Sequence, residues 1–234
     1  MHPLRVPRCP RGVATASLLL AAPFASAADV GGHAALTSDY VWRGTSQSDE
    51  GPAVQAGFKR AADSGLYAQA WVSSVESAPQ SGASTELDLV AGWSGGLGDS
   101  LALDVNLTHY LFPSTAVDLD WTETVATLTW QDRYWFQLAH SNDALASGAT
   151  GTYAQLGARL PLNGRLRLEA AAGHYRLADA SGYDDYTHLQ VGAVWAVAAP
   201  VELRVTAHDT DAAAERGFGP WAGSRFEAAL QVSF

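Results

Sequence analysis

The sequence predicts an all-β fold, namely a transmembrane up-and-down antiparallel β-barrel of about 12 strands. Three observations predict it: apolar and polar residues alternate along many short segments, short and long connections alternate between those segments, and an export signal stands at the N-terminus. After that signal, the longest apolar stretch is VGAVWAVAAPV, which Gly192 and Pro200 interrupt. It is about half as long as a transmembrane helix requires, so strands are the remaining way to cross a bilayer.

Residues 1–27 are predicted to be a Sec signal peptide, which leaves residues 28–234 as the barrel domain. Three arginines precede the short apolar stretch GVATASLLLAAPFASA, and Ala25 and Ala27 occupy the small-residue positions of a cleavage site. The alternative is an N-terminal membrane anchor. It is disfavoured because the stretch is too short to span a bilayer and contains Pro23.

The charge and the cysteine content narrow the classes of partner and cofactor. The chain carries 14 basic and 24 acidic residues, and removal of the predicted leader leaves 11 bases and a net charge of about −13. An acidic surface of this kind disfavours nucleic acid as a partner. The single cysteine, Cys9, lies in the leader away from the cleavage point, which disfavours both a disulfide and a lipoprotein anchor. No cofactor is expected.

The strands are predicted from residues that alternate between two faces. From residue 101 to 107 the odd positions are leucine or valine, whereas Asp104 and Asn106 lie on the other face. Burying such a charge unpaired in a dry core is costly, but the polar face of a barrel lines a wet or ion-paired lumen. A soluble β-sandwich with one solvated face is the alternative. The predicted strands span residues 32–43, 53–60, 66–74, 85–94, 101–111, 121–130, 134–141, 152–160, 165–175, 186–196, 201–208 and 225–234.

The connections between these strands alternate in length. The odd-numbered ones are long, and the even-numbered ones are short, as in AADSG, QDR and PLNG. Outer-membrane barrels show this alternation, with the short turns and both termini at the periplasmic end. The long loops are rich in Asp and Glu, which bind water or bridge to lipopolysaccharide through divalent cations. The segments YDDYTH and HDTDAAAE lack the spacing of an EF-hand or a zinc site, so no specific metal site is predicted.

Aromatic residues cluster at the ends of the predicted strands, where they would form the two interfacial girdles of a membrane barrel. A soluble sandwich would instead bury its aromatic residues in mid-strand. The cluster near the long loops contains Trp42, Tyr110, Phe112, Trp121, Tyr153, Tyr175 and Tyr186, and the cluster near the short turns contains Phe58, Tyr67, Trp93, Trp130, Tyr134, Trp195 and Phe234.

The segment LTSDYVWRGTSQSDEGPAVQAGF, residues 36–58, resembles the N-terminal signature of the TorF-type porin family of bacterial outer-membrane β-barrels. The resemblance implies an outer-membrane, porin-like role and supplies no catalytic or ligand-binding site. As a strand, the segment places Tyr40 and Trp42 on the outward face and Asp39 and Arg43 on the inward face. Asp39 and Arg43 would stand about 13 Å apart, so they need separate cross-strand partners. Arg43 then either belongs to an ion-pair network or contacts the solute.

The predicted function is passive diffusion of small hydrophilic solutes through a narrow, weakly cation-preferring channel whose solute is unidentified. A non-conducting structural or receptor barrel is the alternative. An enzyme is disfavoured because His140 and Asn142 share a face opposite Ser141, so no Ser, His and Asn constellation assembles locally. The pore-lining candidates are Asp39, Arg43, Glu86, Asp88, Asp104, Glu123, Arg159, Arg167, Glu169, Glu202, Arg204 and Glu227. With Arg165 and Arg225, which are also predicted to face inward, the lumen has a slight excess of acids.

The last strand, FEAALQVSF, is similar to the terminal β-signal of outer-membrane proteins, which the barrel-assembly machinery recognises. Phe226, Leu230 and Phe234 lie on its apolar face. Together with the Sec signal, this strand predicts the outer membrane of a Gram-negative bacterium as the location of the protein. Outer-membrane lipid, lipopolysaccharide and the barrel-assembly machinery are therefore the expected partners.

Overall fold

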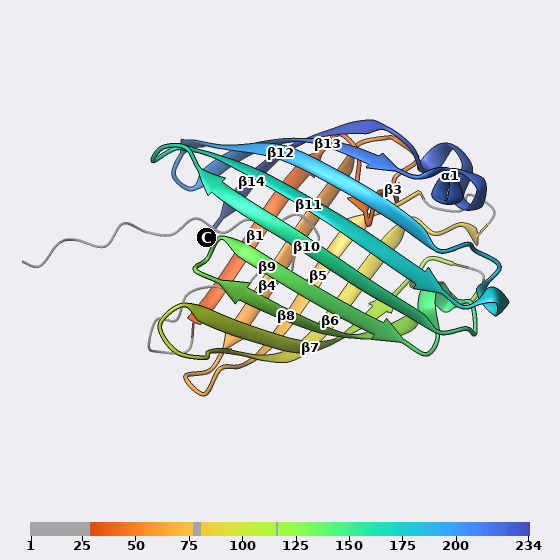
Figure 1. Cartoon of the computed structure of the whole chain (residues 1–234), viewed down its shortest axis with the longest axis horizontal. Helices are drawn as coiled ribbons and strands as arrows, with labels where there is room; N and C mark the ends of the chain where they lie inside the picture. Colours follow the sequence, from red (N-terminus) through yellow and green to blue (C-terminus); the bar gives the residue numbers. More distant parts are fainter. Residues whose placement is uncertain (1–28, 77–80, 116) are drawn as a thin grey trace, which may run out of the picture.

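The computed structural model describes residues 29–76, 81–115 and 117–234. The predicted leader, with the cleavage residues Ala25 and Ala27, lies outside the described residues. Twelve antiparallel strands form a closed barrel in which each strand pairs with its neighbours in the chain and β1 pairs with β14 (Figure 1). The predicted fold class and strand number are confirmed. The barrel strands are β1 (Asp29–Thr37), β4 (Ala53–Ala61), β5 (Leu66–Ser74), β6 (Thr85–Gly96), β7 (Leu101–Leu111), β8 (Trp121–Trp130), β9 (Tyr134–Ser141), β10 (Gly151–Pro161), β11 (Leu166–Leu177), β12 (Tyr186–Ala198), β13 (Val201–Thr210) and β14 (Arg225–Ser233).

The connections differ in length at the two ends of the barrel. The short turns lie between the strands of the pairs β4–β5, β6–β7, β8–β9, β10–β11 and β12–β13. The other end carries the long loops, which contain the short helices η2 (Ala144–Ala146), η3 (Asp179–Ser181), α1 (Ala212–Phe218) and η4 (Gly219–Trp221). Figure 1 shows α1 and the C-terminus at opposite ends of the barrel. The part of the chain that the structure describes contains no helix long and apolar enough to cross a bilayer.

Helix α1 begins and ends at residues suited to those positions. The Asp211 carboxylate accepts hydrogen bonds from the backbone N–H groups of Ala213 and Ala214, at 3.0 and 3.1 Å, and so satisfies two donors of the first turn. The helix ends at Gly219, whose positive φ of 59° a residue with a β-carbon rarely adopts. The loop between β13 and β14 is therefore an ordered structure above the barrel.

The outer face of the barrel is apolar. Leu107, Leu156 and Val191 occupy outward positions of β7, β10 and β12 and are 51%, 64% and 60% exposed. Soluble monomers rarely expose continuous apolar surfaces of this kind, whereas acyl chains cover them in a membrane. The aromatic residues near the short turns also face outward, and they include Phe58, Trp130, Tyr134, Trp195 and Phe234. Tyr67 is an exception because it is buried in the lumen.

The first predicted strand is wrong in its second half. The prediction continued it from residue 32 to 43, but β1 ends at Thr37, and the chain then forms the hairpin of β2 (Val41–Trp42) and β3 (Thr45–Ser46). The reason lies in the tip, where Arg43 and Gly44 have positive φ angles of 47° and 85°. Two such residues make the tight turn that reverses a two-stranded hairpin. Tyr40 and Trp42 consequently pack inside the barrel and not on its outward face.

The predicted outer girdle at the long-loop end is also wrong, because its aromatic residues face the lumen. Tyr110, Trp121, Tyr153, Tyr175 and Tyr186 are all buried, and they occupy the lumen-facing positions of their strands. Their strand parity places them on the same side as the polar residues two positions away. They surround the hairpin instead of contacting the surrounding medium.

Candidate functional site

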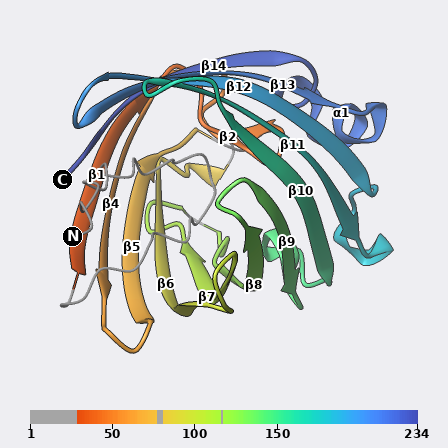
Figure 2. The same ribbon diagram turned by 60° about the vertical axis from the view of Figure 1, so that its left-hand side comes forward.

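The candidate site is the long-loop half of the lumen, into which the chain between β1 and β4 folds. Residues 40–47, which we call the lumen hairpin, lie within the ring of barrel strands (Figure 2). The hairpin is closed by the pairs Val41 with Ser46 and Trp42 with Thr45, and the Gln47 N–H donates to the Tyr40 carbonyl at 2.7 Å. The lumen is therefore partly filled by a segment of the same chain.

Arg43 at the hairpin tip is held by the barrel wall. Its Nη1 and Nη2 donate to Oε1 and Oε2 of Glu123, at 2.9 and 2.7 Å. The guanidinium carbon lies 4.3, 3.9 and 4.7 Å from the ring centroids of Trp42, Tyr153 and Tyr175. A bidentate pair and cation–π contacts both favour a planar cation at this position.

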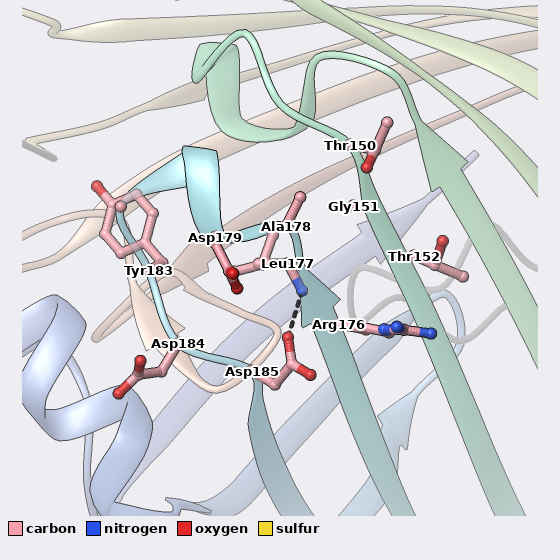
Figure 3. A pocket seen from close by; sticks show the side chains of 11 residues that line it. Thr150, Gly151, Thr152, Arg176, Leu177, Ala178, Asp179, Tyr183, Asp184 and Asp185 are labelled. Atoms are coloured by element: carbon pink, nitrogen blue, oxygen red, sulfur yellow. Dashed lines mark hydrogen bonds between the residues drawn. The ribbon is translucent and has the colours of Figure 1, made fainter.

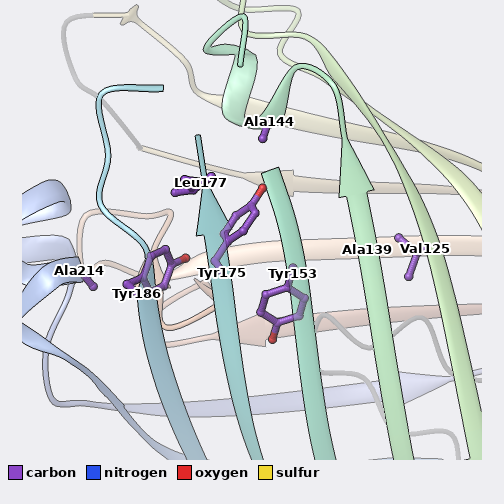
Figure 4. Packing of buried hydrophobic residues seen from close by; sticks show 8 residues of the cluster. All are labelled: Val125, Ala139, Ala144, Tyr153, Tyr175, Leu177, Tyr186 and Ala214. Atoms are coloured by element: carbon purple, nitrogen blue, oxygen red, sulfur yellow. The ribbon is translucent and has the colours of Figure 1, made fainter. Parts of the chain in front are cut away.

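The residues around this ion pair are aromatic on most sides. We call Tyr110, Trp121, Tyr153 and Tyr175, which belong to β7, β8, β10 and β11, the aromatic box. Tyr110 and Trp121 stack with ring centroids 4.3 Å apart, and both meet Trp42 of the hairpin edge to face. Figure 4 shows Tyr153 and Tyr175 on adjacent strands near the long-loop end, within a cluster of buried hydrophobic residues. The box excludes water from the ion pair and strengthens it electrostatically.

Gly44 brings the hairpin against the opposite part of the wall. A β-carbon on Gly44 would lie 2.6 Å from Cβ of His188 on β12 and 2.7 Å from Cγ2 of Thr210 on β13. His188 is itself fixed by a hydrogen bond of 2.8 Å between its Nε2 and the Tyr153 hydroxyl. The hairpin tip is thus held between Glu123 on one side and β12 and β13 on the other.

The base of the hairpin has a separate anchor. Asp39 accepts a hydrogen bond from Ser46 Oγ at 2.6 Å and pairs with Arg225 of β14 at 3.4 Å. Arg225 also donates to the backbone carbonyls of Pro220 and Ala222, at 2.9 and 2.7 Å. Asp39 and Arg43 therefore have different partners, as their predicted separation required, and the hairpin is tied to the loop between β13 and β14.

A second ion-pair cluster lies in the short-turn half of the lumen. Glu169 accepts hydrogen bonds from Arg159 Nε, Arg167 Nε and Arg204 Nη1, at 3.0, 2.9 and 2.7 Å. Arg167 also forms a bidentate pair with Glu202, at 2.8 and 2.9 Å. These five side chains connect β10, β11 and β13 across the inner wall, so no charge in the cluster lacks an opposite partner.

The remaining sequence-predicted residues also lie on lumen-facing positions but outside these two groups. Asp104 accepts from the Tyr67 hydroxyl at 2.9 Å, and Glu227 interacts with His208 Nε2 at 3.0 Å. Glu86 and Asp88 follow each other on the inner face of β6 in the long-loop half. Oδ1 of Asp88 is buried without a hydrogen-bond partner among the described residues. In the described ranges no three His, Cys, Asp or Glu side chains are placed to hold a metal ion.

The sequence prediction missed the aromatic box, although its signal is present in the sequence. Trp121 stands two residues before Glu123, and Tyr153 stands two residues before Gln155, so each shares a face with a polar residue. Assigning aromatic residues by face, and not by their position along the strand, would have placed them in the lumen.

An open pocket of about 770 Å³ lies at the loop between β9 and β10 and the loop between β11 and β12 (Figure 3). Thr152, Arg176, Asp179 and Tyr183 contribute to its lining. Asp185 accepts a hydrogen bond from the backbone N–H of Leu177 at 2.7 Å, which holds the loop after β11 against the strand end. The pocket is a surface feature of the loops and does not include a residue of the ion-pair clusters.

A closed antiparallel barrel with an apolar outer face, an ion-paired lumen and an inward-folded loop defines the porin-like class of β-barrel. Within this class, the chain belongs to the Gcw_chp family, described as bacterial proteins of unknown function, whose profile matches residues 21–233. The match does not confirm the TorF-type resemblance of residues 36–58.

Two solved structures illustrate the fold. The KdgM porin in complex with disordered oligogalacturonate superposes with a TM-score of 0.56 at 8% identity, over 88% of this chain and 98% of that one. The NanC porin superposes with a TM-score of 0.55 at 10% identity, over 88% of this chain and 99% of that one. At these identities the likeness shows the fold alone. The search of curated proteins gives no match.

Proposed function

We propose that this protein is a porin-like channel of the Gram-negative outer membrane that lets small hydrophilic solutes diffuse passively, with a weak preference for cations. The main support for the proposal is the difference between the outward-facing and the inward-facing residues of the same strand. Outward positions such as Leu107 are apolar and exposed, whereas inward positions of the same strand carry Asp104, Asn106 and Thr108. A polar lumen inside an apolar cylinder is the arrangement that lets water and ions pass a bilayer.

The lumen charges support the cation preference. Among the described inward positions, carboxylates outnumber cationic side chains by eight to six. The carboxylates are Asp39, Glu86, Asp88, Asp104, Glu123, Glu169, Glu202 and Glu227, and the cations are Arg43, Lys59, Arg159, Arg167, Arg204 and Arg225. The small acidic excess favours a weak rather than a strict selectivity. It also disfavours an anionic oligosaccharide, such as the oligogalacturonate of the KdgM complex, as the solute here.

Further features support the outer-membrane location. The segment 36–58 resembles the TorF-type porin family, residues 1–27 fit a Sec signal, and the last strand fits the β-signal of the barrel-assembly machinery. Lys59, Arg60, Arg133 and Arg165 lie near the short turns, and the long loops are rich in acids. This distribution fits a barrel whose long loops face lipopolysaccharide. Fractionation of cells that express the full chain should recover the protein with the outer membrane.

A non-conducting structural or receptor barrel is the second candidate, and one observation favours it. The lumen hairpin buries Tyr40, Val41 and Arg43 against the wall, so part of the cross-section is filled. An enzymatic site finds no such support. His140 is exposed and contacts Thr152 and Asn142, whereas Ser141 is buried and donates to the Thr122 carbonyl, so no hydrogen bond joins Ser141 and His140.

Planar-bilayer recordings of the purified protein separate these candidates. The channel proposal predicts discrete conductance steps and, under a KCl gradient, a reversal potential of the sign expected for a small excess of K⁺ current. A membrane that stays silent after insertion, verified by protease protection in vesicles, would favour the non-conducting barrel. Clear Cl⁻ selectivity would contradict the cation preference while leaving the channel in place.

A further inference from the structure

Arg43 is bound to the barrel in the way that a free ligand would be bound. Every group of the barrel wall that contacts its guanidinium belongs to a strand far from residue 43 in the sequence. The guanidinium carbon stands 3.9 Å from the centroid of the Tyr153 ring, and both carboxylate oxygens of Glu123 accept from it. We propose that Glu123 and the aromatic box form a binding site for guanidinium cations, which Arg43 occupies as an internal ligand.

The wall part of this site remains complete without the hairpin. Glu123 makes its two short contacts, at 2.9 and 2.7 Å, with Arg43, and its other contact is a hydrogen bond of 3.3 Å from the Tyr110 hydroxyl. If Arg43 leaves, a buried carboxylate loses its cation inside an aromatic enclosure. An incoming cation restores that pairing, so the vacated site has a strong drive to bind one.

The geometry selects a guanidinium over an ammonium ion. Two parallel N–H groups match the two oxygens of Glu123, and the flat faces of the cation match the rings of Tyr153 and Tyr175. An ammonium ion can form only a point contact with the carboxylate. A neutral planar molecule such as urea lacks the charge that the buried carboxylate requires.

The tip of the hairpin is joined to the wall by contacts that a competing cation can replace. Only two residue pairs join β2 and β3, and neither strand pairs with a barrel strand in the described residues. Its tip contacts the wall through side chains and through Gly44, so these contacts can separate without breaking the barrel ladder. This step rests on the proposed channel function, because displacement of the hairpin would clear the lumen for a solute of the same chemistry.

The binding test uses the full chain in detergent with methylguanidinium as the probe. In Arg43→Ala we expect methylguanidinium to raise the temperature of barrel unfolding and to bind at least tenfold more tightly than it binds wild type. Methylammonium and urea are the probe controls. The matched variant Arg43→Ala/Glu123→Gln should lose the effect, because its site has no carboxylate. Equal binding to the double variant would overturn the proposal.

A second measurement keeps the test valid if Arg43→Ala does not fold. Thr45 is buried in the hairpin, and Cys9 is the single native cysteine. In the background Cys9→Ser, the variant Thr45→Cys should react several-fold faster with a water-soluble maleimide when methylguanidinium is present, and not when methylammonium is. An unchanged rate would show that guanidinium does not compete with Arg43 and would overturn the proposal. Neither measurement requires conduction, so a failed channel proposal and a failed binding site give different results.

Discussion

Among single residues, the pair of Arg43 and Glu123 attaches the tip of the lumen hairpin to the barrel wall. Both side chains are buried, and the pair is bidentate at 2.9 and 2.7 Å. Two charges at this depth stabilise the structure only together, because either one alone is left without a counterion. The effects of removing Arg43 and of removing Glu123 are therefore expected to be coupled.

This coupling can be measured with a double-mutant cycle. Arg43→Ala should lower the free energy of unfolding by roughly 3–5 kcal/mol, because it leaves the Glu123 carboxylate buried and unpaired. Adding Glu123→Gln should recover a large part of that loss. Urea unfolding in lipid vesicles, followed by tryptophan fluorescence, gives the four free energies. If the losses in the free energy of unfolding were additive, Arg43 and Glu123 would not be coupled.

Gly44 provides a test that leaves the charges untouched. Gly44→Ala places a methyl group within 2.7 Å of His188 and Thr210, so the hairpin tip has to move away from the wall. Single-channel recording should then show a larger conductance than that of wild type. Gly148→Ala is the matched control, because Gly148 also has a positive φ, of 71°, but has no atom within 4 Å of its added carbon. An equal change in both variants would show that backbone strain, and not the contact, is responsible.

Much of the residue placement followed from parity alone. Counting in twos along β7, β8 and β11 places Asp104, Glu123 and Glu169 on the inner face, where the structure has them. The prediction for the aromatic residues at the long-loop end was wrong because it used their position near the strand ends. Trp121 shares the face of Glu123, so the same count would have placed it correctly.

At the scale of elements, the hairpin of β2 and β3 is the feature that local sequence rules could not predict. The stretch LTSDYVWR alternates with period two whether it continues a barrel strand or forms one arm of a hairpin. Arg43 and Gly44 are a weak signal for a two-residue turn, because Asn or Asp is preferred before the glycine. What folds the segment inward is the set of partners on β8, β10, β11, β12 and β13, which are brought together only by closure of the barrel.

The last strand closes the barrel, and its terminal residue is expected to matter for assembly. The Phe234 N–H donates to the Gly32 carbonyl at 2.9 Å, and the Gly32 N–H donates back at 2.7 Å. Phe234 and Phe226 lie on β14 or at its end and are 75% and 78% exposed. Phe234→Ala should reduce the amount of protein assembled in the outer membrane several-fold, because it changes the predicted β-signal.

Phe226→Ala is the control for that prediction. It removes an aromatic side chain of the same kind and similar exposure from the other end of β14. Heat-dependent mobility on gels of outer-membrane fractions reports the assembled fraction of each variant. Equal losses in the two variants would assign the effect to lost apolar surface and not to recognition of the terminal residue.

At the scale of the whole molecule, the lumen charges are divided unevenly between the two ends. The long-loop half holds five carboxylates against two arginines, and the short-turn half holds three carboxylates against four cations. The first group comprises Asp39, Glu86, Asp88, Glu123 and Glu227 with Arg43 and Arg225, and the second comprises Asp104, Glu169 and Glu202 with Lys59, Arg159, Arg167 and Arg204.

A channel with this division should rectify. Channels inserted in one orientation are expected to pass unequal currents at equal voltages of opposite sign in 0.1 M KCl. The asymmetry should shrink in 1 M KCl, since the screening length falls from about 10 Å to about 3 Å. Current–voltage curves at both concentrations provide the measurement. Curves that are symmetric at both would contradict an electrostatic difference between the two halves.

The proposed channel requires a water-filled path through the barrel, and the lumen hairpin would restrict that path. The most direct test compares single-channel conductance of wild type and the Arg43→Ala/Glu123→Gln variant in the same membrane and salt. Wild type should give resolved conductance steps and the variant clearly larger ones, because the hairpin tip loses its ion pair with the wall. Identical steps would contradict the role of the hairpin, and an absence of current in both would contradict the channel itself.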